Sequence, residues 1–479
     1  AKKIEGLAQE ASERYAQLKA EFDNKLAQAK AIEEPQATKT FAEKAAKAAQ
    51  KVVIDEAATR LIIDQMLADA GWQADTVNLT HAKGARPERN KNKAIAEWPT
   101  KGKQSADYML FAGLTPIAAV EAKRLNINVA GKIPQAERYA RGIVVEKEHQ
   151  PAWEKEGRTT PWPDGEGNVF NLPFVYSCNG RPFVKQSPEA SGTWHRDVRS
   201  PANLRKVLVG FHSPEGLLDQ LTRSKAEAEE KLRQEGFGYL HLRDYQEKAI
   251  SAVEVALANG QQNCLLAMAT GTGKTRTIIG LMYRFLKTER FRRILFLVDR
   301  TALGQQATEA FDEAPLEQGL PLSKAYNIAE MGDMAAEAET RVQVATVQAM
   351  VKRIFGSDNP PPLDAYDCII VDEAHRGYAL DQDMTEGEMA LRDQAQYLSS
   401  YRRVLDYFDA AKIGLTATPA KHTTEIFGKP VYTYSYREAV ADDWLIDHEP
   451  PIRYQTLLTK NGIHFDKGDT VETLNMSTG

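Results

Sequence analysis

Short apolar runs alternate with longer helix-like segments along the second half of the chain. The runs that predict strands cover residues 263–269, 293–299, 342–347, 367–371 and 412–415. Their length is typical of buried strands and too short for buried helices. Helical segments between consecutive strands indicate a parallel sheet with helical crossovers. The pattern therefore predicts an α/β domain from about residue 237.

A different pattern, two β-rich runs around a Gly- and Pro-containing turn, lies nearer the N-terminus. The runs cover residues 106–111 and 117–123, and this arrangement predicts a hairpin. If the turn is centred on Leu114, Asp107 pairs with Glu121, and their Cβ atoms lie about 5 Å apart. The hairpin is therefore expected to bring two carboxylates together.

The first 48 residues are rich in Ala, Lys, Glu and Gln and predict a helical arm. Ile4, Tyr15 and Leu26 recur at an 11-residue spacing, which keeps one apolar stripe on a nearly straight helix. Because this stripe is short, we expect the arm to pack on its own domain rather than to form a coiled-coil dimer.

Two more helices are predicted, one at about 54–70 and a charged one around 217–234. Residues 164–168 predict a turn rather than a calcium loop, because the remaining ligands are missing. The expected organisation is a helical arm (1–48), an α/β domain around the hairpin (49–215), a helical connector (216–236), a parallel-sheet domain (237–440) and the beginning of a further domain (441–479).

Composition narrows the class of protein. The 479 residues are 42% hydrophobic, which suits about two to four domains with separate cores. No stretch approaches the length of a membrane span and the N-terminus is charged rather than signal-like, so we expect a cytoplasmic protein without a membrane partner. Cys178, Cys264 and Cys368 read as core residues in a reducing compartment. A net charge of −5 confines any nucleic-acid contact to local patches.

The string Met-Ala-Thr-Gly-Thr-Gly-Lys-Thr at 268–275 follows one of the predicted strands and precedes an apolar helix. Glycines at 271 and 273 let backbone N–H groups turn toward phosphate oxygens. Lys274 can place its ammonium on the β- and γ-phosphates, and Thr275 can give its hydroxyl to Mg²⁺. Met268 stands where the general pattern has its first glycine, but the half that wraps the phosphates is kept. We therefore predict an ATP-binding phosphate loop.

An acidic string at the end of another predicted strand complements this loop. Asp372 follows the run 368–371 and can hold the Mg²⁺ shell, while Glu373 can polarise the attacking water. Either string alone fits an ordinary turn. Two such strings, each ending an apolar strand, predict an ATPase.

The predicted hairpin offers a separate chemistry. Lys123 lies two residues beyond Glu121 and projects from the same face of its strand. Asp107 and Glu121 can share a Mg²⁺ ion, while the lysine orients a nucleophile or offsets transition-state charge. A charged hairpin edge is the alternative interpretation. Gln135 and Tyr139, one turn apart on the next predicted helix, can face the same site.

Six strings occur in the order found in superfamily 2 helicases and translocases, which the second half of the chain resembles. They cover residues 242–246, 269–275, 298–300, 345–348, 372–375 and 416–419. The resemblance implies a RecA-like motor domain. It also implies that ATP is bound by Arg243, Gln246 through adenine, Thr270, Gly271, Thr272, Gly273, Lys274, Thr275 and Asp372. DNA contact or coupling is implied for Arg300, Thr346, Gln348, His375, Thr416 and Thr418. Small hydroxyl and amide groups suit contacts to the DNA backbone.

The hairpin, together with the Gln-x-x-x-Tyr helix, resembles the PD-(D/E)XK nuclease core, with Ala106 in place of the proline. The resemblance implies that Asp107, Glu121 and Lys123 are catalytic and that the two carboxylates hold the metal. Glu56 matches the place of a further acidic residue in such nucleases, although Asp55 is adjacent and helix phase alone does not choose between them.

A nuclease domain that precedes such a motor is similar to the restriction subunit of type I restriction-modification enzymes. That family implies ATP-dependent translocation of double-stranded DNA, Mg²⁺-dependent cleavage, and methyltransferase and specificity subunits as partners. The arginine-bearing string of a second RecA-like domain is missing after Pro419, so we expect a fragment of a longer chain. Two alternatives stay open, namely a stand-alone DNA-repair or processing nuclease-helicase and a non-catalytic DNA-binding scaffold.

Overall fold

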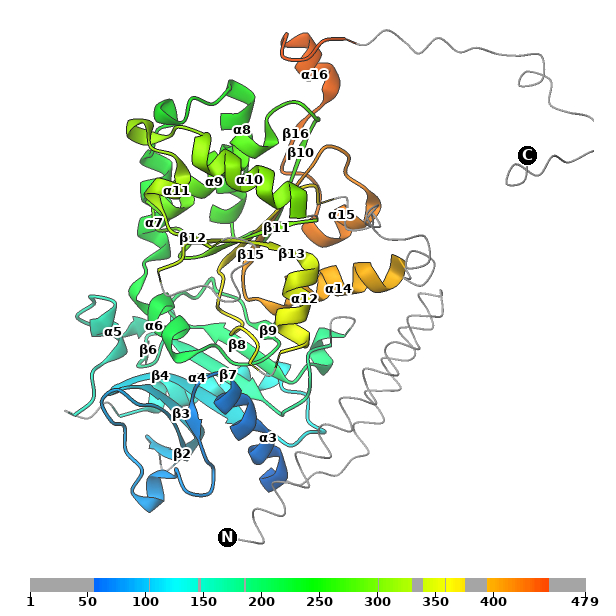
Figure 1. Ribbon diagram of the computed structural model, residues 1–479. Coiled ribbons are helices and arrows are strands. Elements are labelled where there is room, and N and C mark those ends of the chain that lie inside the picture. Colours follow the sequence, from blue (N-terminus) through cyan, green and yellow to red (C-terminus); the bar gives the residue numbers. More distant parts are fainter. Residues whose placement is uncertain are drawn as a thin grey trace, which may run out of the picture.

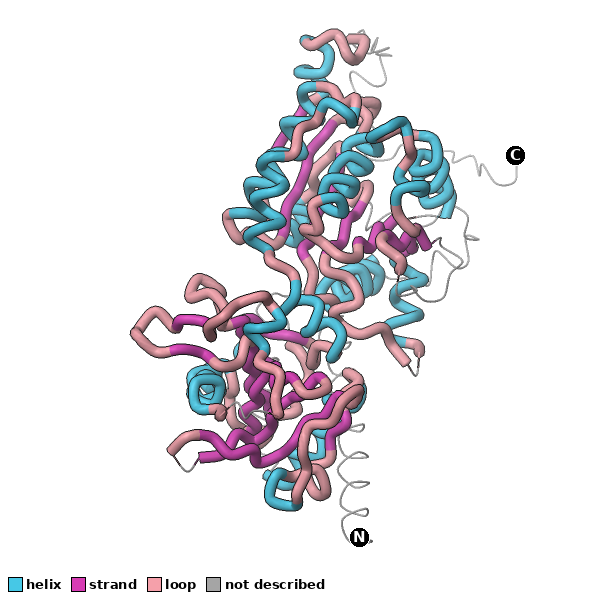
Figure 2. Tube along the Cα trace, turned by 90° about the vertical axis from the view of Figure 1, so that its left-hand side faces the viewer, coloured by secondary structure: helices cyan, strands magenta, loops and turns pink. Residues whose placement is uncertain are grey.

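The computed structural model describes residues 56–102, 104–144, 148–184, 187–299, 301–329, 339–357, 359–374 and 394–447. They form two α/β bodies, one above the other, each built around its own seven-stranded sheet (Figures 1 and 2). The expected arm at 1–48, the residues Arg300 and His375, and the segment 448–479 lie outside the described residues. No described helix is long and apolar enough to cross a membrane.

The lower body in Figure 1 is a mixed sheet in the order β1-β2-β3-β4-β7-β8-β9. Its strands are β1 (Gln73–Ala74), β2 (Asn92–Thr100), β3 (Gln104–Ala112), β4 (Thr115–Ala122), β7 (Phe174–Cys178), β8 (Thr193–Asp197) and β9 (Lys206–Leu208). The accompanying helices are α3 (Glu56–Asp69), α4 (Ile133–Gly142) and α5 (Ala152–Lys155), and β5 (Trp162–Pro163) pairs with β6 (Val169–Phe170) in a separate ribbon. Residues of α3 and α4 join the sheet in one buried apolar core.

The predicted hairpin is confirmed as β3 and β4. Tyr108 pairs with Val120 and Leu110 with Ala118, the register that places Asp107 opposite Glu121. A bulge after Leu110 shifts the pairing nearer the turn. The pairs next to the two carboxylates keep their regular register.

Strands β7 and β8 fall between residues 151 and 201, a stretch rich in Pro, Gly and Asn for which no strand was predicted. β7 is buried along its whole length and pairs in parallel with β4, so it reads as a continuous apolar run rather than an alternating one. The turn expected at 164–168 is confirmed, because the Asp164 carboxylate accepts hydrogen bonds from the backbone N–H groups of Glu166 and Asn168.

The single connector helix expected around 217–234 is wrong. The chain forms α6 (Pro214–Thr222) and α7 (Lys225–Gln234), separated by an extended Arg223. The hydroxyl of Ser224 accepts a hydrogen bond from Glu227 N and begins the second helix, a capping signal that competes with continuation of the first. As a result, α6 packs on the lower core through Leu217 and Leu221.

The upper body is a fully parallel sheet in the order β12-β13-β11-β14-β15-β10-β16, as the alternating pattern predicted. Its strands are β10 (Asn263–Met268), β11 (Ile294–Val298), β12 (Ile328–Ala329), β13 (Val342–Thr346), β14 (Cys368–Val371), β15 (Ala411–Thr416) and β16 (Tyr432–Tyr434). Its helices are α8 (Asp244–Ala258), α9 (Lys274–Lys287), α10 (Thr301–Glu313), α11 (Leu322–Ala325), α12 (Val347–Phe355), α14 (Gln394–Tyr407), α15 (Lys421–Phe427) and α16 (Tyr436–Ala441). The five predicted strands are confirmed to within about a residue, and their carboxyl ends carry the chemical strings. The three cysteines are buried and free, as expected of core residues.

The two bodies meet through polar contacts at the amino ends of β14 and β15. Asp409, just before β15, accepts from Lys206 Nζ at 2.6 Å and lies 2.7 Å from His212 Nε2. Asp364, shortly before β14, accepts from Ser213 N at 2.8 Å. Burial alone would raise the pKa of Asp409, but Lys206 and His212 hold it well below its usual range. The lower body thus contacts the parallel sheet where its strands begin, at the end opposite the loop between β10 and α9.

His195 lies next to this junction, and we expect it to make the free energy of unfolding depend on pH. Its ring is buried, 4.6 Å from that of Tyr176 and 4.9 Å from that of His212, and burial lowers its pKa well below 6.5. The folded protein therefore keeps His195 neutral, while the unfolded chain takes up a proton below about pH 6.5. The free energy of unfolding should fall by up to about 1.4 kcal/mol per pH unit below that point.

Chemical unfolding of wild type and His195→Phe at pH 7.5 and 5.5 measures this contribution. The variant should lose less stability between the two pH values than wild type does. An equal loss in both proteins would show that His195 is not the group responsible.

Candidate functional site

The first candidate site lies on the β3–β4 hairpin. Asp107 is held from two sides, because its Oδ2 accepts from Ala122 N and its Oδ1 from the guanidinium of Arg60 on α3, both at 2.7 Å. The Glu121 side chain is fully buried and forms an ion pair with Lys123, whose side chain is 27% exposed. The structure therefore brings Asp107, Glu121 and Lys123 together, as predicted from their strand register.

Helix α4 adds the two residues predicted from its one-turn spacing. Gln135 Nε2 donates to the Tyr139 hydroxyl at 3.1 Å. Burial raises the pKa of Tyr139, and a hydrogen bond to Glu121 raises it further, so the hydroxyl remains a donor. Helix α4 packs on the sheet beside the hairpin, and it thus adds the side chains of Gln135 and Tyr139 to the hairpin site.

The electrostatics of the hairpin site suit a cation. Burial raises the pKa of both Asp107 and Glu121, and the charge of Asp107 raises that of Glu121 further. Two adjacent carboxylates whose ionised forms are disfavoured gain from a divalent ion. Within the described ranges, no group of three or more His, Cys, Asp or Glu side chains could hold a metal. A pair of carboxylates fits Mg²⁺, which is commonly held by one or two carboxylates and keeps several waters.

The second candidate site is the loop between β10 and α9. Gly271 and Gly273 have φ angles of +83° and +76°, in the left-handed region that favours glycine. The hydroxyl of Thr272 donates to Ala269 O at 2.6 Å and holds the turn. Lys274 and Thr275 then open α9, whose N-terminal N–H groups are suited to anions. Thr270 is exposed on the same loop.

Helix α8 braces this loop from the side. Gln246 donates through Nε2 to the carbonyls of Thr272 and Gly273 at 3.1 and 3.0 Å, and the Tyr245 hydroxyl donates to Thr272 O at 2.7 Å. Gln246 Oε1 also accepts from Arg243 N at 3.0 Å. The predicted Arg243 and Gln246 are therefore beside the loop, and much of the hydrogen-bonding capacity of Gln246 is used to hold it.

The acidic string lies across from the loop, at the end of β14. Glu373 Oε1 is 3.4 Å from Lys274 Nζ, so the predicted lysine and carboxylate form an ion pair. Glu373 has φ +48°, and its N–H donates to Asp372 Oδ1 at 2.9 Å. A non-glycine residue in this backbone region costs on the order of 1–3 kcal/mol, a strain that is common at functional sites.

The remaining predicted residues take different places. Thr346 ends β13 and caps α12 by accepting from Ala349 N at 3.2 Å, and Gln348 follows in α12. Thr416 ends β15, and its hydroxyl accepts from Thr418 N at 3.2 Å. Glu56 begins α3, but its side chain is outside what the structure describes, as are Arg300, His375 and the alternative Asp55.

Two site residues were missed by the sequence analysis. Arg60, which binds Asp107, lies one helical turn after Glu56, and that spacing is the signal that could have identified it. Trp444 lies far along the chain from Arg243, and its ring centroid is 4.0 Å from the Arg243 guanidinium carbon. No local sequence pattern links Trp444 to the loop.

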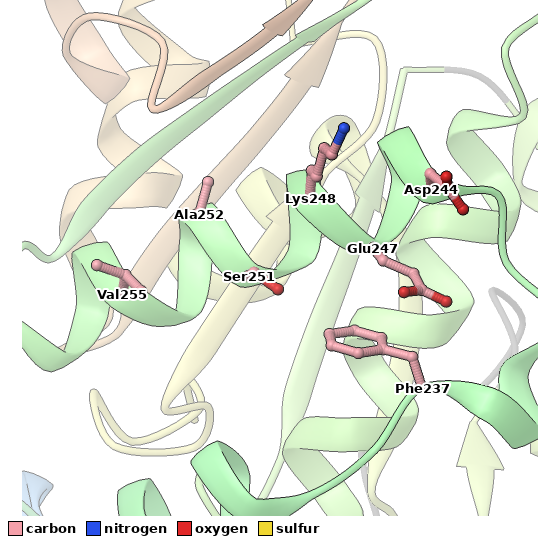
Figure 3. A pocket seen from close by; sticks show the side chains of 7 residues that line it. All are labelled: Phe237, Asp244, Glu247, Lys248, Ser251, Ala252 and Val255. Atoms are coloured by element: carbon pink, nitrogen blue, oxygen red, sulfur yellow. The ribbon is translucent and has the colours of Figure 1, made fainter.

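A shallow hollow lies along the outer face of α8, opposite the face that braces the loop (Figure 3). It is lined by Phe237, Asp244, Glu247, Lys248, Ser251, Ala252 and Val255. Charged and apolar side chains both line this open hollow, and no predicted site residue is among them.

Two models of known protein families match the two halves of the chain. Residues 73–221 match the model of the second domain of the type I restriction enzyme EcoKI endonuclease subunit, and residues 239–421 match that of the res subunit of type III restriction enzymes.

Among solved structures, the chain is similar to a fragment of a protein described as an HsdR subunit of a type I restriction enzyme from Vibrio vulnificus YJ016. The identity is 23%, the match covers 82% of this chain and 61% of that one, and the TM-score is 0.30.

Two curated relatives cover most of the chain. The EcoKI endonuclease subunit of Escherichia coli K12 is 48% identical over 441 residues, which are 88% of this chain and 37% of the relative. The EcoAI endonuclease subunit of Escherichia coli is 29% identical over 366 residues, 72% of this chain and 37% of the relative. The chain thus spans little more than a third of their length. The extent of this identity and the match to the EcoKI domain model place the chain in the family of type I restriction enzyme endonuclease subunits.

Proposed function

We propose that this chain carries the nuclease and the first motor domain of a type I restriction subunit, which translocates double-stranded DNA with ATP and cleaves it with Mg²⁺. The observation that carries this proposal is the presence of two separate sites on one chain. A carboxylate pair with a lysine lies in one α/β body, and a phosphate loop facing an acidic strand end lies in the other. The lower body would be a PD-(D/E)XK-like nuclease and the upper body a RecA-like motor.

In the nuclease, Asp107 and Glu121 would hold Mg²⁺, which supplies an acidified water and neutralises charge on the scissile phosphate. Arg60 and Ala122 N hold Asp107 in place while it does so. Lys123, partly exposed beside Glu121, would contact the attacking water or the phosphate. Gln135 and Tyr139 would orient Glu121 from α4.

In the motor, the backbone N–H groups of the loop and Lys274 would bind the nucleotide phosphates, and Thr275 with Asp372 would hold its Mg²⁺. Glu373 would then exchange its ion pair with Lys274 for a contact to the attacking water. Two pairs of residues, Thr346 with Gln348 and Thr416 with Thr418, lie at or just after the carboxyl ends of β13 and β15. There they would contact the DNA backbone and couple its movement to hydrolysis.

The relatives are named as endonuclease subunits of type I restriction enzymes. We propose by this likeness that the present chain works with methyltransferase and specificity subunits, which would choose the DNA site. Such an enzyme acts on DNA in the cytoplasm.

Reconstitution with its methyltransferase and specificity subunits tests this function. Long unmethylated DNA that carries the recognition site should be cut only when all subunits, ATP and Mg²⁺ are present, and methylated DNA should remain intact. A stand-alone nuclease-helicase would cut unmodified DNA with full ATP dependence but without partners, and that result would contradict the proposal. Absence of any Mg²⁺-dependent cleavage in the complete complex would favour the non-catalytic scaffold.

A further inference from the structure

The segment after β16 returns to the phosphate loop and places aromatic rings beside it. Tyr434 stacks on Tyr245 with centroids 4.0 Å apart and planes inclined by 10°. A Cβ atom added at Gly271 would lie 3.1 Å from Leu445 Cδ2, so the segment touches the loop itself. Trp444, the neighbour of Leu445, lies over the guanidinium of Arg243.

Packing alone accounts for Tyr434 and Leu445 but not for Trp444. Tyr434 and Leu445 are buried or partly buried against the motor core, whereas Trp444 keeps 46% of its surface exposed. An exposed tryptophan stacked on an arginine at the rim of a phosphate site presents a flat, electron-rich face to a base. By contrast, both ends of the Gln246 amide already bond to the loop and to the start of α8.

We propose that Trp444, together with Arg243, forms the platform on which the purine base of the nucleotide stacks. This inference rests on the proposed ATP site, whose loop would hold the phosphates of the same nucleotide. Stacking uses the flat face of the base rather than its hydrogen-bonding edge, so the platform would bind adenine and guanine nucleotides alike. A ligand that has phosphates but no base would not contact this platform.

Equilibrium binding of ADP and of pyrophosphate to the full-length protein separates the platform from the loop. Trp444→Ala should weaken ADP binding by about tenfold, in the range of a lost base–aromatic stack, and leave pyrophosphate binding unchanged. Trp444→Phe should stay near wild type because the platform is kept. Wild type should show a change in tryptophan fluorescence on ADP binding that Trp444→Phe lacks.

Ile446→Ala is the matched control, since this side chain is 91% exposed two residues away and should leave both ligands unaffected. Equal weakening of ADP and pyrophosphate by Trp444→Ala would mean damage to the loop, and unchanged ADP binding would mean that no base stacks there. Either outcome overturns the inference. Failure of the ATP site itself gives a different result, in which wild type binds neither ligand and Lys274→Ala changes nothing.

Discussion

Lys274→Ala is expected to abolish ATP hydrolysis, and with it DNA translocation. Lys274 is 8% exposed, opens α9 directly after the glycines of the loop, and lies 3.4 Å from Glu373. Its ammonium is the positive charge placed to meet the β- and γ-phosphates, and loss of one such preorganised group costs on the order of 10²- to 10³-fold in rate. Steady-state hydrolysis with and without DNA measures the effect.

Lys274→Ala needs a control, because this change leaves the Glu373 carboxylate in place. Removal of the ammonium takes an ion-pair partner away from the partly buried Glu373, which by itself destabilises the fold. Glu373→Gln removes the charge instead and should retain ADP binding while losing hydrolysis, because the acid acts on water and not on the phosphates of the bound product. DNA-stimulated ATPase activity that survives in a folded Lys274→Ala protein would contradict the role of the loop.

Asp107→Asn is expected to abolish Mg²⁺-dependent DNA cleavage while ATP hydrolysis continues. The amide is close in shape to the carboxylate, and its oxygen can still accept from Ala122 N or Arg60. The variant should therefore fold, but it lacks one of the two charges that hold the metal. Cleavage of unmethylated DNA by the complete complex should fall by on the order of 10²-fold or more.

Lys123→Ala should lose cleavage in the same way, because it keeps both carboxylates but removes the ammonium that pairs with Glu121. The matched control is Glu97→Gln, because Glu97 lies 3.5 Å from Arg60 at the edge of the site and is half exposed. It should cleave at the rate of wild type. Unchanged cleavage in both Asp107→Asn and Lys123→Ala, with ATPase activity intact, would refute the hairpin as the nuclease centre and leave the motor assignment in place.

Residues close together along the chain were placed well by sequence patterns. The strand that ends before Asp372 and the loop glycines at 271 and 273 were predictable, because apolar runs and glycine-rich turns are local signals. The pairing of Asp107 with Glu121 was predictable because a tight turn sets the register of a hairpin.

Sequence patterns were less informative where composition masked a strand or a cap interrupted a helix. β7 has no alternation because both of its faces are buried, and it lies among turn-forming residues. Ser224 ended a helical pattern that otherwise runs through the connector. Packing decided the first case and helix capping the second. Each outweighed what the amino-acid composition of the segment suggested.

The local strings by themselves therefore predicted two chemistries, a phosphate loop with its acidic partner and a carboxylate pair with its lysine. What holds those groups in place came from contacts that the fold makes between distant segments. Arg60 reaches Asp107 from helix α3, Asp409 joins the parallel sheet to His212, and Trp444 returns to Arg243 about two hundred residues away. No periodicity or spacing in the sequence links the members of such pairs. Packing of the two cores, and not local backbone preference, brings these distant residues together.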